Sequence, residues 1–191
     1  DEEFLVRLEK ELKTGLDMVF FCTPDNPSGV LISKDILLQS LELCEKYYAR
    51  MVVDESFWEF AFDREAETML PYIGQFQSLF LLRSFTKMYG IPGLRLGYGL
   101  CSDTDLLERM EEVRQPWGVS IPAQEAGIAA LDETDWCRQV RSYVTEQRMW
   151  LAGELESMGC KVYPSSANYL LFYLDQELME ALFRVVQDQT G

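Results

Sequence analysis

The sequence predicts an α/β fold. Short apolar runs typical of buried strands alternate along the chain with stretches whose apolar residues recur at helical spacing. This alternation of helix and strand indicates a sheet covered by helices. Several polar residues stand directly after the apolar runs. Because open α/β sheets bind their ligands beyond the carboxyl ends of the strands, we expect a binding site there.

The first elements follow this alternation. Residues 1–13 predict a helix whose apolar positions recur at helical spacing, namely Phe4, Leu5, Leu8 and Leu12. Met18 to Cys22 predicts a short buried strand that ends at TPDNPSG. Ser33 is the expected N-cap of the next helix, with Asp35 in the first turn. The apolar stripe of that helix is expected to contain Leu37, Leu41, Cys44 and Tyr48.

Three further strands are expected next: Met51 to Val53, which stops at Asp54 and Glu55, then Leu79 to Leu82, then Leu96 to Cys101. Helices are predicted after them, over Asp103 to Arg114, Pro122 to Leu131 and Asp135 to Met158.

The polar cluster DETD at residues 132–135 is the expected hinge between two units, over residues 1–134 and 135–191. The second unit is expected to hold strands at Cys160 to Tyr163 and Asn168 to Leu174, and a last helix from Gln176 to about Gln187. So few elements can hardly build a core of their own. We therefore expect the chain to be a piece of a longer protein.

Composition argues against several classes of function. The 191 residues are 48% hydrophobic and 26% charged, as in an ordinary globular protein. The net charge of −15 argues against a nucleic-acid binder, because affinity for the phosphate backbone needs many Lys and Arg side chains. No apolar run approaches the roughly 20 residues of a membrane helix. We expect a soluble, cytoplasmic protein that binds neither nucleic acid nor membrane.

Cysteine and histidine usage narrows the chemistry. The five cysteines are scattered without a C-x-x-C pair, so neither a zinc cluster nor a disulfide framework is expected. The chain contains no histidine, which makes a Ser-His-Asp triad, a Cys-His pair and a histidine zinc site impossible within it. Proton transfer near neutral pH must then use a carboxylate, a tyrosine, a cysteine or a lysine.

One lysine stands in an unusual place. Lys87 follows the strand expected at Leu79 to Leu82 and precedes a turn at Gly90. At the end of a central strand its amine is expected to be partly desolvated, which favours the neutral, nucleophilic form. Asn26 and Asp54 also follow strands, so the three side chains are expected to converge on one crevice.

Three motifs occur in the order in which one enzyme family carries them. They are N-P-x-G (Asn26, Pro27, Gly29), D-E (Asp54, Glu55), and S-x-T-K followed by G-x-R-x-G-Y (Ser84, Thr86, Lys87, Gly93, Arg95, Gly97, Tyr98). With these motifs the chain resembles the class I/II aminotransferases, which are pyridoxal-phosphate enzymes of fold type I. The histidinol-phosphate aminotransferase and threonine-phosphate decarboxylase branch is the most similar, judged by Glu59, Phe60, IPGLRLGY and S-x-A-N-Y (Ser165, Ala167, Asn168, Tyr169).

The resemblance implies the fold and the site. It implies a mostly parallel large-domain sheet with helices on both faces, and part of a small α+β C-terminal domain. Lys87 would form a Schiff base with pyridoxal 5'-phosphate and then shuttle the proton at the substrate α-carbon. Asp54 would lie against the pyridine nitrogen, and Asn26 would donate to the phenolic oxygen. Ser84, Arg95 and also Thr86 would bind the phosphate.

Each of these residues also has a purely structural explanation. Asn-Pro-x-Gly is a common turn sequence, Asp54 could cap a strand end, and Arg95 could serve in an ion pair. The joint occurrence in family order favours the cofactor site. For Asn168 the family pattern implies a place beside the substrate, but a buried asparagine bonded to backbone is an equal alternative.

The chain departs from the family pattern at Phe57, where a tyrosine commonly bonds the phenolic oxygen. We expect the missing donor to raise the pKa of the linkage between lysine and cofactor. Decarboxylase-like members accept phenylalanine there, which favours that branch slightly. The family's glycine-rich phosphate loop, ring-stacking aromatic and carboxylate-binding arginine are not found, and Arg184 is not assigned the last role. These residues alone are expected to bind the cofactor weakly.

Three functions remain open at this point. The first is a pyridoxal-phosphate-dependent aminotransferase that acts on an amino acid or a phosphorylated amino compound. The second is a decarboxylase of a phosphorylated amino acid that uses the same lysine. The third, a distant alternative, is an aminotransferase-like sensor domain of a transcription regulator that binds the cofactor without turnover. The resemblance also implies a homodimer, and the substrate is not identified by these residues.

Overall fold

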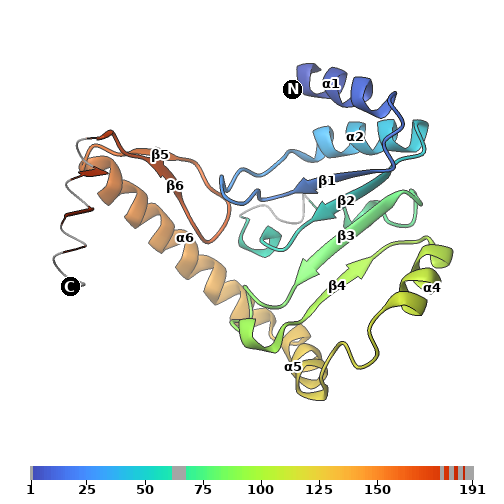
Figure 1. Cartoon of the computed structure of the whole chain (residues 1–191). Helices are drawn as coiled ribbons and strands as arrows, with labels where there is room; N and C mark the ends of the chain where they lie inside the picture. Colours follow the sequence, from blue (N-terminus) through green and yellow to red (C-terminus); the bar gives the residue numbers. More distant parts are fainter. Residues whose placement is uncertain (1, 62–67, 177–178, 181–182, 185–186, 188–191) are drawn as a thin grey trace.

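A computed structural model describes residues 2–61, 68–176, 179–180, 183–184 and 187. Its centre is a sheet whose strands lie in chain order (Figure 1). The first three strands run parallel, and they are β1 (Met18–Cys22), β2 (Arg50–Asp54) and β3 (Leu79–Ser84). Strand β4 (Gly97–Leu100) pairs with β3 in the antiparallel direction. The predicted α/β class and the mostly parallel sheet are confirmed.

Two helices cover one face of this sheet. Helices α1 (Glu2–Leu12) and α2 (Lys34–Lys46) stack above β1 and β2 in Figure 1. Successive strand residues point to opposite faces, so every second strand side chain enters the core beneath these helices. That core contains Leu8, Leu12, Phe21, Leu37, Leu41, Cys44, Ala49, Met51, Val53, Met69, Leu79 and Leu81.

The other face of β1 is open to solvent. Met18 and Phe20, which alternate with the core residues of β1, are 46% and 68% exposed. Helices α4 (Thr104–Val113) and α5 (Ile121–Leu131) lie beyond β4 instead (Figure 1). Within the described ranges, the helical layer expected on this second face therefore does not extend over β1.

A long helix leads away from the sheet to a small C-terminal unit. Helix α6 (Thr134–Ser157) packs its first half against the large unit, where its Cys137 joins Phe60 and Met88 in a second apolar cluster. Beyond it, β5 (Lys161–Tyr163) and β6 (Leu171–Tyr173) form an antiparallel pair. The boundary between residues 134 and 135 stays a prediction.

Most predicted elements lie where the patterns indicated, with shifts at the ends. The helix expected to include Tyr48 ends at Lys46, so the assignment of Tyr48 to its apolar stripe was wrong. Tyr48 adopts φ 59° and is 96% exposed, because the chain turns there toward β2. Ser33 does occupy the N-cap of α2, but its side chain makes no capping hydrogen bond.

The last strand and the last helix differ in extent from the prediction. Strand β6 (Leu171–Tyr173) covers only three residues within the run expected over Asn168 to Leu174. The last helix, expected from residue 176 to about 187, lies partly outside the described residues, and those that are described there are helical.

Short 3₁₀ helices connect the main elements at Trp58–Phe60, Leu70–Tyr72 and Pro92–Leu94. In the part of the chain that the structure describes, no helix combines the length and the apolar character needed to cross a membrane. In the same part, no cysteine, aspartate and glutamate side chains gather in a group that could hold a metal ion.

Candidate functional site

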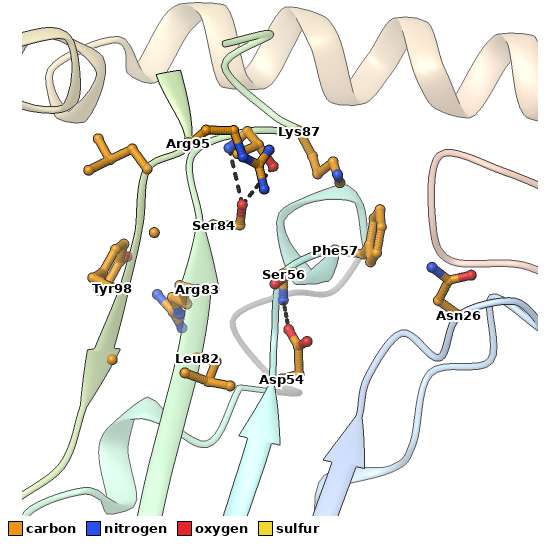
Figure 2. Close-up of a pocket in the computed structure, with 14 residues that line it drawn as sticks. Asn26, Asp54, Ser56, Phe57, Leu82, Arg83, Ser84, Lys87, Arg95 and Tyr98 are labelled. Carbon is orange, nitrogen blue, oxygen red and sulfur yellow. Dashed lines mark hydrogen bonds between the residues drawn. The ribbon is translucent and has the colours of Figure 1, made fainter. Parts of the chain in front are cut away.

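A cavity of about 600 Å³ lies at the carboxyl ends of the parallel strands. This volume falls within the range of small-molecule sites. Six residues predicted from the sequence line it together, namely Asn26, Asp54, Ser84, Thr86, Lys87 and Arg95. Figure 2 shows Asp54 at the tip of β2, Asn26 on the loop after β1, and Lys87 and Arg95 on the segment after β3. The parallel direction of β1, β2 and β3 brings these distant segments to one edge.

Asp54 is fixed by its place at the last position of β2. Its backbone carbonyl accepts a hydrogen bond from the Thr23 amide at 3.0 Å, which extends the ladder between β1 and β2. Its carboxylate Oδ1 accepts the Ser56 amide at 2.8 Å, as the dashed line in Figure 2 indicates. The partly buried carboxylate therefore has a defined orientation in the cavity.

Hydroxyl and guanidinium donors gather on the opposite side of the cavity. The Oγ atom of Ser84 lies 2.7 Å from Oγ1 of Thr86 and accepts the Thr86 amide at 3.1 Å. Arg95 adopts a left-handed backbone with φ 54°, and its Nη1 donates to the Pro92 carbonyl at 3.0 Å. A left-handed conformation is costly for arginine. This costly backbone conformation thus occurs at a residue that lines the cavity.

Two glycines of β4 line the cavity at positions where no side chain fits. A Cβ atom on Gly97 would lie 2.9 Å from the Arg83 carbonyl oxygen, and one on Gly99 would lie 2.5 Å from the Phe80 ring. Side chains at these positions would therefore push strand β4 away from β3 or into the space beside the donors.

Lys87 is exposed, so the expected partial desolvation was wrong for this chain. The lysine lies three residues beyond the end of β3 and therefore outside the sheet. Its Nζ lies 5.7 Å from the centre of the Phe57 ring, over the ring face. No ion pair of Lys87 is found among the described residues.

The loop that carries Asn26 is held by the neighbouring aspartate. Both the amide and the hydroxyl of Ser28 donate to Oδ2 of Asp25, at 3.2 and 2.5 Å. The Asp25 carbonyl accepts the Gly29 amide at 2.7 Å, and its amide donates to the Val30 carbonyl at 2.8 Å. Asn26 is thus presented at the tip of a closed turn.

The C-terminal unit touches this loop. The Tyr169 hydroxyl donates to the Asp25 carbonyl at 2.7 Å, and the Tyr169 ring meets Phe57 edge to face at 5.1 Å. The Ser166 amide donates to the Gly29 carbonyl at 2.8 Å. Burial raises the pKa of Tyr169 to about 12, and the neighbouring Cys22 and the carboxylates of Asp25 and Asp54 act in the same direction. Tyr169 therefore stays a neutral donor at any physiological pH.

Asn168 does not line the cavity that the other six predicted residues share. It lines a separate cavity of about 160 Å³ between α6 and the C-terminal unit, with Tyr143, Val144, Gln147, Arg148, Leu151, Tyr169 and Leu170. The implied contact between Asn168 and a substrate stays a prediction.

Several lining residues were not singled out in the sequence: Ser56, Leu82, Arg83, Leu96 and Gly99. Ser56 and Arg83 are close in sequence to motif residues, which is one signal that could have identified them. The alternation of side chains along a strand could also have placed Arg83 and Glu55 on the same face of the sheet. That pairing carries no motif of its own.

Residues 4–191 match the family Aminotransferase class I and II. The chain is 37% identical over 176 residues to a histidinol-phosphate aminotransferase of Oleidesulfovibrio alaskensis, which covers 87% of this chain and 45% of that protein. It is 34% identical over 168 residues to a threonine-phosphate decarboxylase of Salmonella typhimurium, with coverage of 87% and 45%.

A solved structure supports the fold. The histidinol-phosphate aminotransferase from Clostridium acetobutylicum matches with a TM-score of 0.83 and 26% identity, over 92% of this chain and 54% of that one. The chain thus spans about half the length of the proteins that it matches.

Proposed function

The chain belongs to the class I and II aminotransferase family, and we propose that it is part of a pyridoxal-phosphate-dependent aminotransferase. Its proposed substrate is an amino acid or a phosphorylated amino compound. One observation carries the proposal: a lysine amine, an oriented carboxylate, an asparagine amide and a group of anion-binding donors line one cavity, although they come from three separate segments. The family uses pyridoxal 5'-phosphate.

The lining residues fit this cofactor in size and in chemistry. The hydroxyls of Ser84 and Thr86 and the guanidinium of Arg95 are donors that suit a phosphate. Gly97 and Gly99 have no side chains, so the part of the cavity wall that they form stays open beside these donors. A Cβ atom at either position would collide with neighbouring atoms. Asp54 supplies a carboxylate and Lys87 a nucleophilic amine within the same cavity.

Each residue then has a defined task. When bound, the cofactor supplies an electron sink for charge at the substrate α-carbon. Asp54 would hold a proton at the ring nitrogen by charge attraction. Lys87 would hold the cofactor through its amine, and as a free amine it would move the proton at the substrate α-carbon. Asn26 would donate to the phenolic oxygen and so orient the ring.

A decarboxylase of a phosphorylated amino acid is the second candidate. It is supported by the similarity to the threonine-phosphate decarboxylase and by Phe57, which lines the cavity where a hydroxyl donor is common in the family. The two activities differ in which bond of the α-carbon is broken, and the same lysine serves both. The whole protein is proposed to be a homodimer, as the resemblance implies.

The test uses the full-length protein that contains this chain. It is mixed with pyridoxal 5'-phosphate, reduced with borohydride and digested, and the peptides are mapped by mass spectrometry. We expect the reduced pyridoxyl group on Lys87 in the native protein and none in a Lys87→Arg variant. An adduct elsewhere, or none at all, would overturn the proposal. Keto-acid release from amino donors then indicates transamination, whereas carbon dioxide release indicates decarboxylation.

A further inference from the structure

A buried ion pair lies directly behind the cavity. The Nε and Nη2 atoms of Arg83 donate to Oε2 of Glu55 at 3.0 and 2.7 Å. The Glu55 side chain is 0% exposed and that of Arg83 is 13% exposed. The guanidinium also stacks on Trp58, with its Cζ atom 4.2 Å from the ring centre. A charge pair so deeply buried is tolerated only when its remaining hydrogen-bonding capacity is satisfied.

Thr68 and a backbone amide make the remaining hydrogen bonds to the Glu55–Arg83 pair. The Thr68 hydroxyl lies 3.1 Å from both carboxylate oxygens of Glu55 and accepts Nη2 of Arg83 at 2.9 Å. The Met69 amide donates to Oε1 of Glu55 at 2.8 Å. The Glu55 carboxylate therefore joins three segments of chain: the end of β2, the end of β3 and the residues that begin at Thr68.

The pair stands back to back with two residues of the cavity. Glu55 directly follows Asp54, and Arg83 directly precedes Ser84. Neighbouring residues of an extended strand point to opposite faces of the sheet. The Glu55 amide donates to the Leu82 carbonyl at 2.9 Å and so continues the ladder between β2 and β3. The ion pair thus joins the two strand ends from the face opposite to the Asp54 and Ser84 side chains, although part of Arg83 also lines the cavity.

We propose that Glu55 and Arg83 are a positioning pair, which sets the separation and orientation of Asp54 and Ser84 for the cofactor. The identity of the ligand in this inference rests on the proposed function. The positioning of Asp54 and Ser84 by the ion pair does not depend on that function. Charge by itself does not explain the arrangement, because the bidentate geometry and the stacking on Trp58 fix direction as well as distance.

The test separates positioning from general stability. In the double variant Glu55→Met/Arg83→Met, apolar side chains replace both charges, and such replacements often leave folding intact. In the full-length protein we expect the melting temperature to fall, because the Met69 amide loses its acceptor, and the dissociation constant for pyridoxal 5'-phosphate to rise about tenfold. In the cofactor-free protein, hydrogen exchange at the Ser56 amide, which bonds the Asp54 carboxylate, is expected to speed up relative to the Met51 amide at the start of β2.

A second ion pair provides the matched control. Nη2 of Arg50 lies 2.5 Å from Oδ2 of Asp103 at the other end of the sheet, and both side chains are 20% exposed. The variant Arg50→Met/Asp103→Asn removes that pair, and asparagine keeps the cap that Asp103 forms on α4. We expect it to leave cofactor affinity and Ser56 exchange unchanged.

Two results would overturn the inference: wild-type cofactor affinity together with wild-type Ser56 exchange in the double variant, or equal effects of both pairs. Should the double variant fail to fold, Thr68→Ala decides the question, since it removes hydrogen bonds to Glu55 and keeps both charges. We expect it to raise the dissociation constant about threefold and to speed Ser56 exchange, and no change would count against the pair. If the native protein binds no pyridoxal phosphate, the proposed function fails, while Ser56 exchange still reports on the positioning.

Discussion

The amine of Lys87 lies over the ring of Phe57, with its Nζ atom 5.7 Å from the ring centre. Phe57 in turn meets the Tyr169 ring edge to face at 5.1 Å. The proposed nucleophile thus faces an aromatic surface without a hydroxyl, and the hydroxyl of Tyr169 donates to the Asp25 carbonyl. The missing donor identified in the sequence is therefore not supplied by Tyr169.

The variant Phe57→Tyr tests this relationship. A hydroxyl placed beside the cofactor's phenolic oxygen should stabilise the deprotonated oxygen, and we expect the pKa of the visible absorption band of the bound cofactor to fall. The measurement is a pH titration of that band in the full-length protein. Phe57→Leu is the control, because it changes the side chain without adding a donor. An unchanged pKa in Phe57→Tyr would contradict the prediction.

The hydrogen bond from Tyr169 to Asp25 should contribute measurably to stability. Tyr169→Phe keeps the ring against Phe57 and removes only the donor to the Asp25 carbonyl at 2.7 Å. We expect the free energy of unfolding to fall by about 0.5–1.5 kcal/mol, as for a typical buried hydrogen bond. Urea denaturation measures the change. The exposed Tyr173 on β6 provides the control variant Tyr173→Phe, for which no loss is expected.

Gly29 should not tolerate alanine. Its φ is +74°, and an added Cβ would lie 2.1 Å from the Ser165 Oγ atom and 3.0 Å from the Ser165 Cα atom. We expect Gly29→Ala to destabilise the protein by about 1–3 kcal/mol and to displace the Ser165 segment from the Asn26 loop. Thermal unfolding measures the loss.

Gly15 separates the two causes of the Gly29 effect. Its φ is +92°, but nothing lies within 4 Å of an added Cβ. Gly15→Ala should therefore report the cost of the left-handed backbone alone, and Gly29→Ala should cost more. Equal losses at the two positions would show that the contact with Ser165 is unimportant.

Acidification should loosen the contact between α1 and α2. Hydrogen bonds from Lys46 and Tyr47 lower the pKa of Glu9 to about 2, against 4.5 for a free carboxyl group. Because the pKa is lower in the folded state, this stabilisation is present above pH 4.5 and is lost as the pH falls toward 2. The stability of Glu9→Gln should show a weaker decline over this interval than that of the native chain. Parallel curves for the two proteins would exclude the effect.

The local pattern of apolar residues was enough to predict most helices and strands of the fold. The period of 3.6 in α1 and α2 and the apolar runs of β1, β2 and β3 are short-range features that burial enforces, so they can be recognised without a structure. Tyr48 shows the limit of this reasoning. A helical period does not reveal where the chain leaves the helix, and the left-handed turn at Tyr48 depends on how the chain enters β2.

By itself, the sequence determined the α/β class and the family, together with the motif residues Asn26, Asp54, Ser84, Lys87 and Arg95, because backbone chemistry and cofactor chemistry demand particular residues at particular spacings. Only the tertiary structure decided that Lys87 is exposed, that Asn168 lines another cavity and that Glu55 pairs with Arg83. These properties depend on contacts between residues distant in the chain, whose energies no local pattern encodes.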